Sequence, residues 1–276
     1  MKINRILLKP GIKACSKEIP DYQLAKIVST LFENEIKTEN SILYQVELIK
    51  SKNNCKTYKL SYGNNVYYLK KFFEQSLSKK ILNIFRTTKA FRCYSISHKL
   101  DAANIPVAEP VMYLTCTKRF INRESIFVTK KVDGIPLREY LKQDISSDLK
   151  EKALKKYFFL LGHFYKNGFK HGDPGLYNFF IDVKDNNDYS FTFLDLDVIH
   201  KLPIIPVIVV LNGLAKLYSL SGSYFSDKLP IYIKVFLDAC KKPINMDKAI
   251  CYLVEKGEQR IIKFKNRKRP KGQWVN

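Results

Sequence analysis

Two stretches in the second half of the chain carry side chains that could do chemistry together. The first holds His171 and Asp173, with Asn178 five residues beyond the aspartate, and the second holds Asp195 and Asp197. One aspartate can orient a hydroxyl nucleophile, while an asparagine and another aspartate offer the oxygen ligands that Mg²⁺ prefers. Positioning and charge neutralisation of this kind are what phosphoryl transfer requires. The residue types and their spacing therefore favour phosphoryl transfer.

A hairpin is predicted to bring the second stretch back beside the first. Residues 179–181 are apolar and aromatic, as are residues 191–194 apart from Thr192, and the polar run 184–188 between them is typical of a turn. Residues 149–167, before the first stretch, have a broad apolar face at helical spacing, and Gly168 is a natural terminator for that helix. We expect this helix to support the loop that carries Asp173.

The first half of the chain has the pattern of an antiparallel sheet. Five segments rich in β-branched and aromatic residues, separated by turn-like runs, are predicted as strands: 42–49, 57–61, 66–73, 111–115 and 125–131. Residues 87–103 are predicted as a helix, which ends before the prolines at 106 and 110. Residues 1–40 show one clear signal, a helical spacing over residues 22–32.

A hinge at Asp133-Gly134 is expected to divide the chain into two lobes. After it the pattern is mainly helical, with further helices predicted over 207–220, 227–240 and 246–259. We therefore expect an α+β, bilobal chain. Its N-lobe, residues 1–131, would hold a five-stranded antiparallel sheet plus one helix, and its C-lobe, residues 132–276, would be mainly helical.

Composition limits the class of protein. Six cysteines without a C-x-x-C pair, beside four histidines, give no zinc spacing and favour a reduced, cytosolic setting. The basic N-terminus is not expected to be a signal peptide. The longest apolar stretch, residues 202–211, contains two prolines and is shorter than the ~20 residues of a membrane span.

The net charge of +22 favours anionic partners, which could be nucleic acid, acidic lipid head groups or phosphorylated substrates. Surplus lysine on a solvated surface is the alternative. Residues 260–271 hold seven Lys or Arg and no acid, with few aromatic residues nearby. Contact of this tail with anionic head groups therefore suits it better than nucleic acid, and a disordered, solvated tail is the other interpretation.

The order of a sheet with one helix, a hinge and a helical lobe resembles a protein-kinase-like fold. The run from His171 to Asn178 is similar to the kinase catalytic loop H-x-D-x-x-x-x-N, Asp195 sits where kinases place the D-F-G aspartate, and Tyr68-Leu69-Lys70 looks like the strand end with the phosphate-binding lysine. More closely, the chain resembles the lipopolysaccharide kinase (Kdo/WaaP) family of bacterial sugar kinases. The resembling segments are 88–110, 124–137, 170–181, 193–197 and 211–218.

This resemblance implies roles for five residues. Lys70 would hold the phosphates of ATP, Asp173 would accept or orient the sugar hydroxyl, and His171 would brace the loop. Asn178 and Asp195 would hold Mg²⁺. Strand alternation puts Lys70 and its neighbour Lys71 on opposite faces, so that one faces the nucleotide and the other is expected to be an ordinary surface lysine. Asp197 could be a second metal ligand or a bracing carboxylate.

Three departures from the kinase pattern stand out. Cys93 occupies the position where many kinases have the helix glutamate that pairs with the strand lysine, and no acidic residue occurs between 75 and 100. The first predicted hairpin has no glycine, so a glycine-rich phosphate flap is not expected. Gly172 replaces the arginine that senses a phosphorylated activation loop, so regulation of that kind is not expected either.

The leading hypothesis is an ATP-dependent kinase, a phosphotransferase with an alcohol acceptor. It would phosphorylate a sugar hydroxyl of lipopolysaccharide core, Kdo or heptose, or of a related lipid-linked glycan. The protein would be cytoplasmic and peripheral on the inner face of the bacterial inner membrane. The alternatives are a protein or small-molecule kinase of the same fold, and a non-catalytic kinase-like module that binds nucleic acid or membrane.

Overall fold

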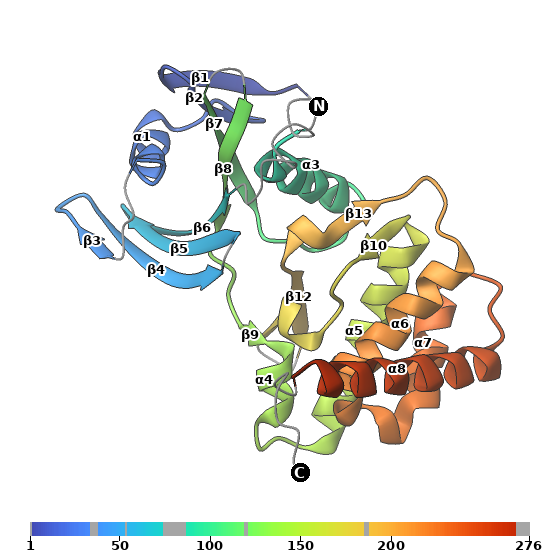
Figure 1. The fold of residues 1–276 in the computed structure, drawn as a ribbon. Coiled ribbons are helices and arrows are strands. Elements are labelled where there is room, and N and C mark those ends of the chain that lie inside the picture. Colours follow the sequence, from blue (N-terminus) through green and yellow to red (C-terminus); the bar gives the residue numbers. More distant parts are fainter. Residues whose placement is uncertain are drawn as a thin grey trace, which may run out of the picture. The chain divides into compact units, whose positions relative to one another are not determined.

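The computed structural model describes residues 2–33, 38–52, 54–73, 87–118, 121–184 and 188–268 (Figure 1). The chain divides into two compact units. The first consists of Met1–Ala102 and Val107–Val132, and the second of Ala103–Pro106 and Asp133–Asn276.

The first unit is built on an antiparallel sheet. Its strands among the described residues are β1 (Asn4–Lys9), β2 (Ile12–Ser16), β3 (Thr38–Asn40), β4 (Tyr44–Lys52), β5 (Cys55–Tyr62), β6 (Asn65–Phe73), β7 (Pro110–Lys118) and β8 (Ile121–Lys130). Their order in the sheet is β1-β2-β7-β8-β6-β5-β4-β3. The five predicted strands are β4 to β8, and the α+β class is confirmed.

The predicted number of five strands was wrong, because the described sheet has eight. The strands β1 and β2 are short and form a hairpin at Gly11, whose φ of +82° suits glycine. A Cβ at Gly11 would lie 2.3 Å from the carbonyl oxygen of Thr117, where the hairpin meets β7. The third missed strand, β3, is three residues long, which is too short for a periodic pattern to be visible in the sequence.

A helix packs on each face of this sheet (Figure 1). The helix α1 (Tyr22–Thr30) buries Leu24 and Val28 in a cluster with Leu60 and Leu69 of the sheet. The helix α3 (Lys89–Asp101) packs against β7 and β8, and the hydroxyl of Thr88 caps its first turn by accepting from the backbone N–H of Phe91 at 3.3 Å. The two faces of β6 therefore have different helical neighbours.

The second unit combines small strands with helices. The strands β9 (Ile135–Pro136), β11 (Phe179–Val183) and β12 (Tyr189–Phe193) form one sheet, and β10 (Phe169–His171) pairs with β13 (Ile199–Lys201). The helices are α4 (Leu137–Lys142), α5 (Ser147–Lys166), α6 (Val207–Ser221), α7 (Leu229–Cys240) and α8 (Met246–Lys268). Short 3-10 turns are η1 (Leu176–Asn178), η3 (Leu196–Val198), η4 (Gly222–Tyr224) and η5 (Ser226–Lys228).

The helix α5 forms the support that its sequence pattern predicts. Its Tyr157 and Phe164 are fully buried. The ring of Phe164 stacks on Phe193 at 5.2 Å, and Phe193 meets Phe179 edge to face at 4.5 Å. Aromatic pairs of this geometry add to the stabilisation that burial provides. The core beneath β11 and β12 is therefore packed with aromatic rings where the two predicted functional stretches begin and end.

The helix α8 is longer than predicted. The sequence pattern predicts a helix that ends at residue 259, but α8 runs to Lys268, so the interpretation of a disordered tail was wrong for residues 260–268. Lysine and arginine are good helix formers, and cations near a helix C-terminus complement its dipole. The remainder of the basic tail lies outside the described residues. Among the helices that the structure describes, none has both the length and the apolar character that crossing a bilayer requires.

Candidate active site

The loop from His171 to Asn178 is held to the core of the second unit along its length. It leaves β10 at His171, where β10 pairs with Ile199 of β13. The backbone N–H of Gly172 donates to the carbonyl oxygen of Val198 at 2.8 Å. The buried hydroxyl of Tyr157 on α5 donates to the carbonyl oxygen of Pro174 at 2.8 Å. The loop is therefore fixed by backbone contacts before any ligand is bound.

The predicted hairpin does bring Asp195 back to this loop. The strands β11 and β12 pair in a register that sets Phe179 opposite Phe193. The N–H of the next residue, Leu194, donates to the carbonyl oxygen of Asn178 at 2.9 Å, and its carbonyl oxygen lies 3.4 Å from Nε2 of His171. Asp195 follows directly, with a left-handed φ of 57°. Aspartate tolerates this conformation better than most residues, and such residues often lie at functional sites.

His171 is buried, with 2% of its surface exposed. Its Nδ1 accepts from the backbone N–H of Asp173 at 3.0 Å, so Nε2 carries the proton and donates to Leu194. Burial lowers the pKa of His171 from 6.5 to about 4, which keeps the ring neutral. The ring connects the aspartate loop to the residue before Asp195.

This buried histidine predicts a pH-dependent stability. Its pKa in the folded chain, about 4, lies below the ordinary value of 6.5. Its contribution to stability is therefore complete above that ordinary value and is lost as the pH falls toward about 4. The loss between about pH 7 and about pH 5 is about 2 kcal/mol. Denaturant titrations at both pH values should show this loss in the wild type and in His200→Gln, and a smaller loss in His171→Gln. If His171→Gln loses as much stability between the two pH values as the wild type, His171 is not the group responsible for the pH dependence.

The carboxylate of Asp173 is held on both oxygens. Its Oδ1 lies 3.3 Å from Nζ of Lys216, which also donates to the carbonyl oxygen of Gly172 at 2.5 Å. Its Oδ2 accepts from the hydroxyl of Tyr177 and, at 3.3 Å, from Nδ2 of Asn178. The same Nδ2 donates to the backbone oxygen of Asp173 at 2.8 Å. These contacts orient the carboxylate and turn the amide oxygen of Asn178 away from it.

Two of these neighbours, Lys216 and Tyr177, were given no role by the sequence interpretation. Lys216 comes from α6, which packs against η1 and β10, and only that packing brings it to Asp173. Tyr177 lies within the predicted loop. The related signal in the sequence is the glycine at position 175. In the structure, a Cβ at Gly175 would lie 2.4 Å from the ring of Tyr177. Glycine thus allows the tyrosine to fold back over the loop and reach Asp173.

The first unit separates the two candidate lysines as alternation predicts. Lys70 lies on the face of β6 that α3 covers, where Nζ of Lys70 and Nζ of Lys89 both lie 5.6 Å from the ring centre of Phe72. Lys71 lies on the face that α1 covers. It is 5% exposed, its Nζ donates to the carbonyl oxygen of Leu31 at 2.5 Å, and it pairs with Glu124 at 3.0 Å. The expectation of an ordinary surface lysine was therefore wrong for Lys71, which is a buried structural residue.

Replacing the two lysines is expected to change two different properties, the stability of the fold for Lys71 and the affinity for ATP for Lys70. Lys71→Met leaves Glu124 without its partner in a largely buried position, so the free energy of unfolding should fall by about 3 kcal/mol. Lys70→Met is expected to weaken ATP binding about tenfold, because the charged hydrogen bond predicted between Lys70 and a phosphate would be lost. Denaturant unfolding and ATP titration of both variants provide the measurement, and each variant is the control for the other. Unaltered ATP affinity in Lys70→Met would show that Lys70 does not hold the phosphates of ATP.

Cys93 lies where the acidic partner of the strand lysine was expected. Its side chain is buried on α3, and the hydroxyl of Ser97 donates to its backbone oxygen at 2.7 Å. The carboxylate of Glu124, from β8, pairs with Lys71. Neither residue therefore reproduces the helix glutamate that the kinase pattern would place beside Lys70.

The predicted metal ligands are the carboxylate of Asp195 and the amide oxygen of Asn178. Within the described part of the chain, no three His, Cys, Asp or Glu side chains converge as a metal site. Mg²⁺ does not require such a cluster, because it keeps several waters and binds one or two carboxylates together with substrate phosphates. The donor set therefore fits Mg²⁺ bound with a nucleotide and does not fit a protein-only zinc site.

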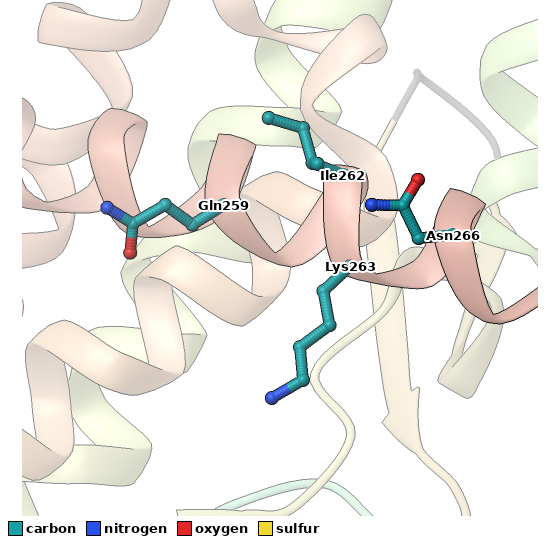
Figure 2. A pocket seen from close by; sticks show the side chains of 4 residues that line it. All are labelled: Gln259, Ile262, Lys263 and Asn266. Atoms are coloured by element: carbon teal, nitrogen blue, oxygen red, sulfur yellow. The ribbon is translucent and has the colours of Figure 1, made fainter.

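A surface hollow of about 500 Å³ lies along α8 (Figure 2). It is lined by Gln259, Ile262, Lys263 and Asn266, all from this one helix. None of these side chains is a carboxylate, and none is among the predicted site residues. The hollow therefore offers no carboxylate that could act as a base or as a charged metal ligand.

A protein-family model and solved structures are similar to the chain. Residues 50–201, more than half of the chain, match the family model described as the lipopolysaccharide kinase (Kdo/WaaP) family. No curated protein sequence matches the chain. Among solved structures, WaaP in complex with acyl carrier protein shares 13% identity at a TM-score of 0.59, over 84% of this chain and 91% of that one. That similarity shows the same kinase-like fold.

Two further solved structures align less well. A Ralstonia eutropha protein described as an aminoglycoside phosphotransferase has 10% identity and a TM-score of 0.49, over 86% of this chain and 89% of that chain. The autoinhibited serine kinase domain of titin has 8% identity and a TM-score of 0.49, over 80% of this chain and 82% of that chain.

Proposed function

The chain belongs to the lipopolysaccharide kinase (Kdo/WaaP) family, and from this premise we propose that it is an ATP-dependent kinase that phosphorylates a sugar hydroxyl. The acceptor is lipopolysaccharide core, at Kdo or heptose, or a related lipid-linked glycan. One observation carries the proposal. The backbone of Leu194 is hydrogen-bonded to Asn178 and to His171, which sets Asp195 beside the loop of Asp173.

Five residues have proposed roles. Asp173 orients the acceptor hydroxyl and takes its proton, and Lys216 and Asn178 keep its carboxylate in place. Asn178 and Asp195 are the residues that would hold Mg²⁺, which when bound supplies charge neutralisation at the phosphates. Lys70 holds the phosphates of ATP. His171 braces the loop as a neutral ring.

We propose further that residues 1–131 serve as the nucleotide-holding lobe and residues 132–276 as the lobe with the catalytic and metal-binding loops. The helix α8 supports a peripheral location on the inner face of the bacterial inner membrane. Its last turns combine basic residues with Ile262 and Phe264, which are 58% and 59% exposed. Exposed apolar side chains among cations suit a surface of anionic head groups better than nucleic acid.

The test is a transfer assay with the full chain, labelled ATP and lipopolysaccharide core. We expect label on the core sugar in the presence of Mg²⁺ and none when Mg²⁺ is chelated. Transfer to protein or to small alcohols but not to lipopolysaccharide would show that the acceptor assignment is wrong. Absence of Mg²⁺-dependent ATP binding would exclude a kinase of any kind and favour a binding module.

A further inference from the structure

One cation of the second unit lies directly against the carboxylate of the proposed base. It is Lys216 of α6, whose Nζ lies 3.3 Å from Oδ1 of Asp173. The same Nζ donates to the carbonyl oxygen of Gly172 at 2.5 Å. The side chain of Lys216 is 35% exposed and that of Asp173 is 26% exposed. Neither side chain is therefore closed off from a ligand that binds at the loop.

The packing of α6 fixes the place of this lysine. Leu214 and Leu217, on either side of it in the helix, are buried. A Cβ at Gly213 would collide with the hydroxyl of Tyr165 on α5, so the glycine lets α6 approach α5 closely. The helix also contacts β10 and η1, the two ends of the Asp173 loop. The backbone beneath Lys216 is therefore set against the loop by the core of the unit.

Orientation of Asp173 does not account for all that Lys216 can do. The other carboxylate oxygen, Oδ2, accepts from the hydroxyl of Tyr177 and from Nδ2 of Asn178, so Lys216 is one of three groups that hold the carboxylate. An ammonium has three N–H donors. Within the described part of the chain, Gly172 and Asp173 engage two of them. A third donor of Lys216 is therefore available to an oxygen of a substrate.

The reaction proposed at Asp173 brings negative charge close to this ammonium. A hydroxyl that donates to the carboxylate lies about 2.7 Å from it, and reacting atoms in a productive complex lie about 3 to 3.5 Å apart. The phosphoryl group is therefore about two such contacts away from Asp173, and Lys216 touches the same carboxylate. The flexible stem of a lysine can span that gap. Charge on the oxygens of the transferring group is stabilised by a fixed cation.

We propose that Lys216 is a catalytic residue, which donates a hydrogen bond to an oxygen of the phosphoryl group during transfer. The inference rests on the proposed function and adds a residue to its machinery. In this step the acceptor oxygen forms a bond to the γ-phosphorus of ATP, and the bond from that phosphorus to the bridging oxygen breaks. The hydroxyl proton passes to Asp173, and ADP leaves. Lys216 keeps its protons throughout, so its contribution is charge.

A double-mutant cycle with the full chain tests this role. The four forms are the wild type, Lys216→Met, Asp173→Ala and the double variant, each assayed for initial-rate transfer from labelled ATP to lipopolysaccharide core. Transfer to water is measured on the same samples, since it needs no sugar. A lysine that acts only by holding Asp173 has no effect once Asp173 is absent, whereas one that contacts the phosphoryl group keeps its effect. We expect Lys216→Met to lower kcat about 10²-fold in both backgrounds.

The controls separate loss of charge from loss of structure. Lys234→Met, at an exposed lysine of α7, is the matched variant and should transfer like the wild type. Lys216→Arg keeps a cation and should stay within about tenfold of the wild type. The free energy of unfolding of each variant is measured first. Lys216→Gln, a polar side chain without the charge, replaces Lys216→Met if that variant does not fold.

The outcomes distinguish this role from the reaction itself. An unchanged rate in Lys216→Met, or a loss that disappears in the Asp173→Ala background, would overturn the catalytic role and leave Lys216 as a positioning residue. Transfer to water without transfer to lipopolysaccharide refutes the proposed acceptor, and the cycle is then read on the rates with water. A wild type that transfers to neither acceptor refutes the proposed function, and the role of Lys216 with it.

Discussion

Asp173→Ala is expected to lower kcat for phosphate transfer by about 10²- to 10⁴-fold, the usual contribution of a positioned acid or base. The carboxylate is held by Lys216, Tyr177 and Asn178, so it is oriented before the substrate arrives. Its removal takes away the group that orients the hydroxyl and accepts its proton. ATP binding should persist, because Asp173 is not among the residues proposed to hold the nucleotide or the metal.

The measurement is initial-rate transfer to lipopolysaccharide, together with the phosphate content of lipopolysaccharide in cells that carry either form. The matched control is Asp182→Ala, an aspartate of β11 in the same unit whose carboxylate accepts from Ser190 at 3.4 Å. We expect the control to retain transfer. Turnover within a few-fold of the wild type in a folded Asp173→Ala protein would contradict the assignment of the base.

Asp195→Ala is expected to abolish Mg²⁺-dependent ATP binding and to lower turnover by about 10³-fold. This estimate corresponds to the several kcal/mol of charge stabilisation that a metal provides at a phosphoryl group. Asp195 is the carboxylate of the predicted donor pair, and the amide oxygen of Asn178 alone is a weak ligand for Mg²⁺. The hydrogen bonds that position the loop come from the backbone of Leu194 and are kept in the variant, while alanine at the left-handed φ of 57° costs about 1 kcal/mol of stability.

Titration of ATP with and without Mg²⁺ measures this effect, and Asp197→Ala is the companion variant. Asp197 lies in η3, two residues further along the same turn. An equal loss in both variants would make Asp197 a second ligand, whereas a loss in Asp195→Ala alone would make Asp197 a bracing residue. Wild-type Mg²⁺ dependence in Asp195→Ala would show that the metal is held elsewhere.

Much of the fold was predictable because it is encoded over short distances along the chain. The strands β4 to β8 and the helix α5 have the periodicity of side chains that face one core. The spacing of Asp173 and Asn178 is a property of one loop, and the hairpin of β11 and β12 is local as well. The strand β3 was missed because its three residues are too few for a period to be seen, whereas β1 and β2, of six and five residues, were missed although they are as long as β11 and β12.

The contacts of the candidate site depend on packing between distant segments. Alternation along β6 separates Lys70 from Lys71, but it does not say which face each helix covers. Only the packing of α1, with Glu124 from β8, makes Lys71 a buried structural cation. Lys216 reaches Asp173 because α6 packs on the loop.

The sequence by itself therefore determined the family, the order of most elements, and the identity of the loop residues. All of these depend on the spacing of residues that are close together in the sequence. The tertiary structure decided which cation orients the carboxylate, which lysine is structural, and which side chains surround Asp173. The physical reason is that a side chain's partner is set by the burial of apolar faces, and that burial brings together segments that no local pattern connects.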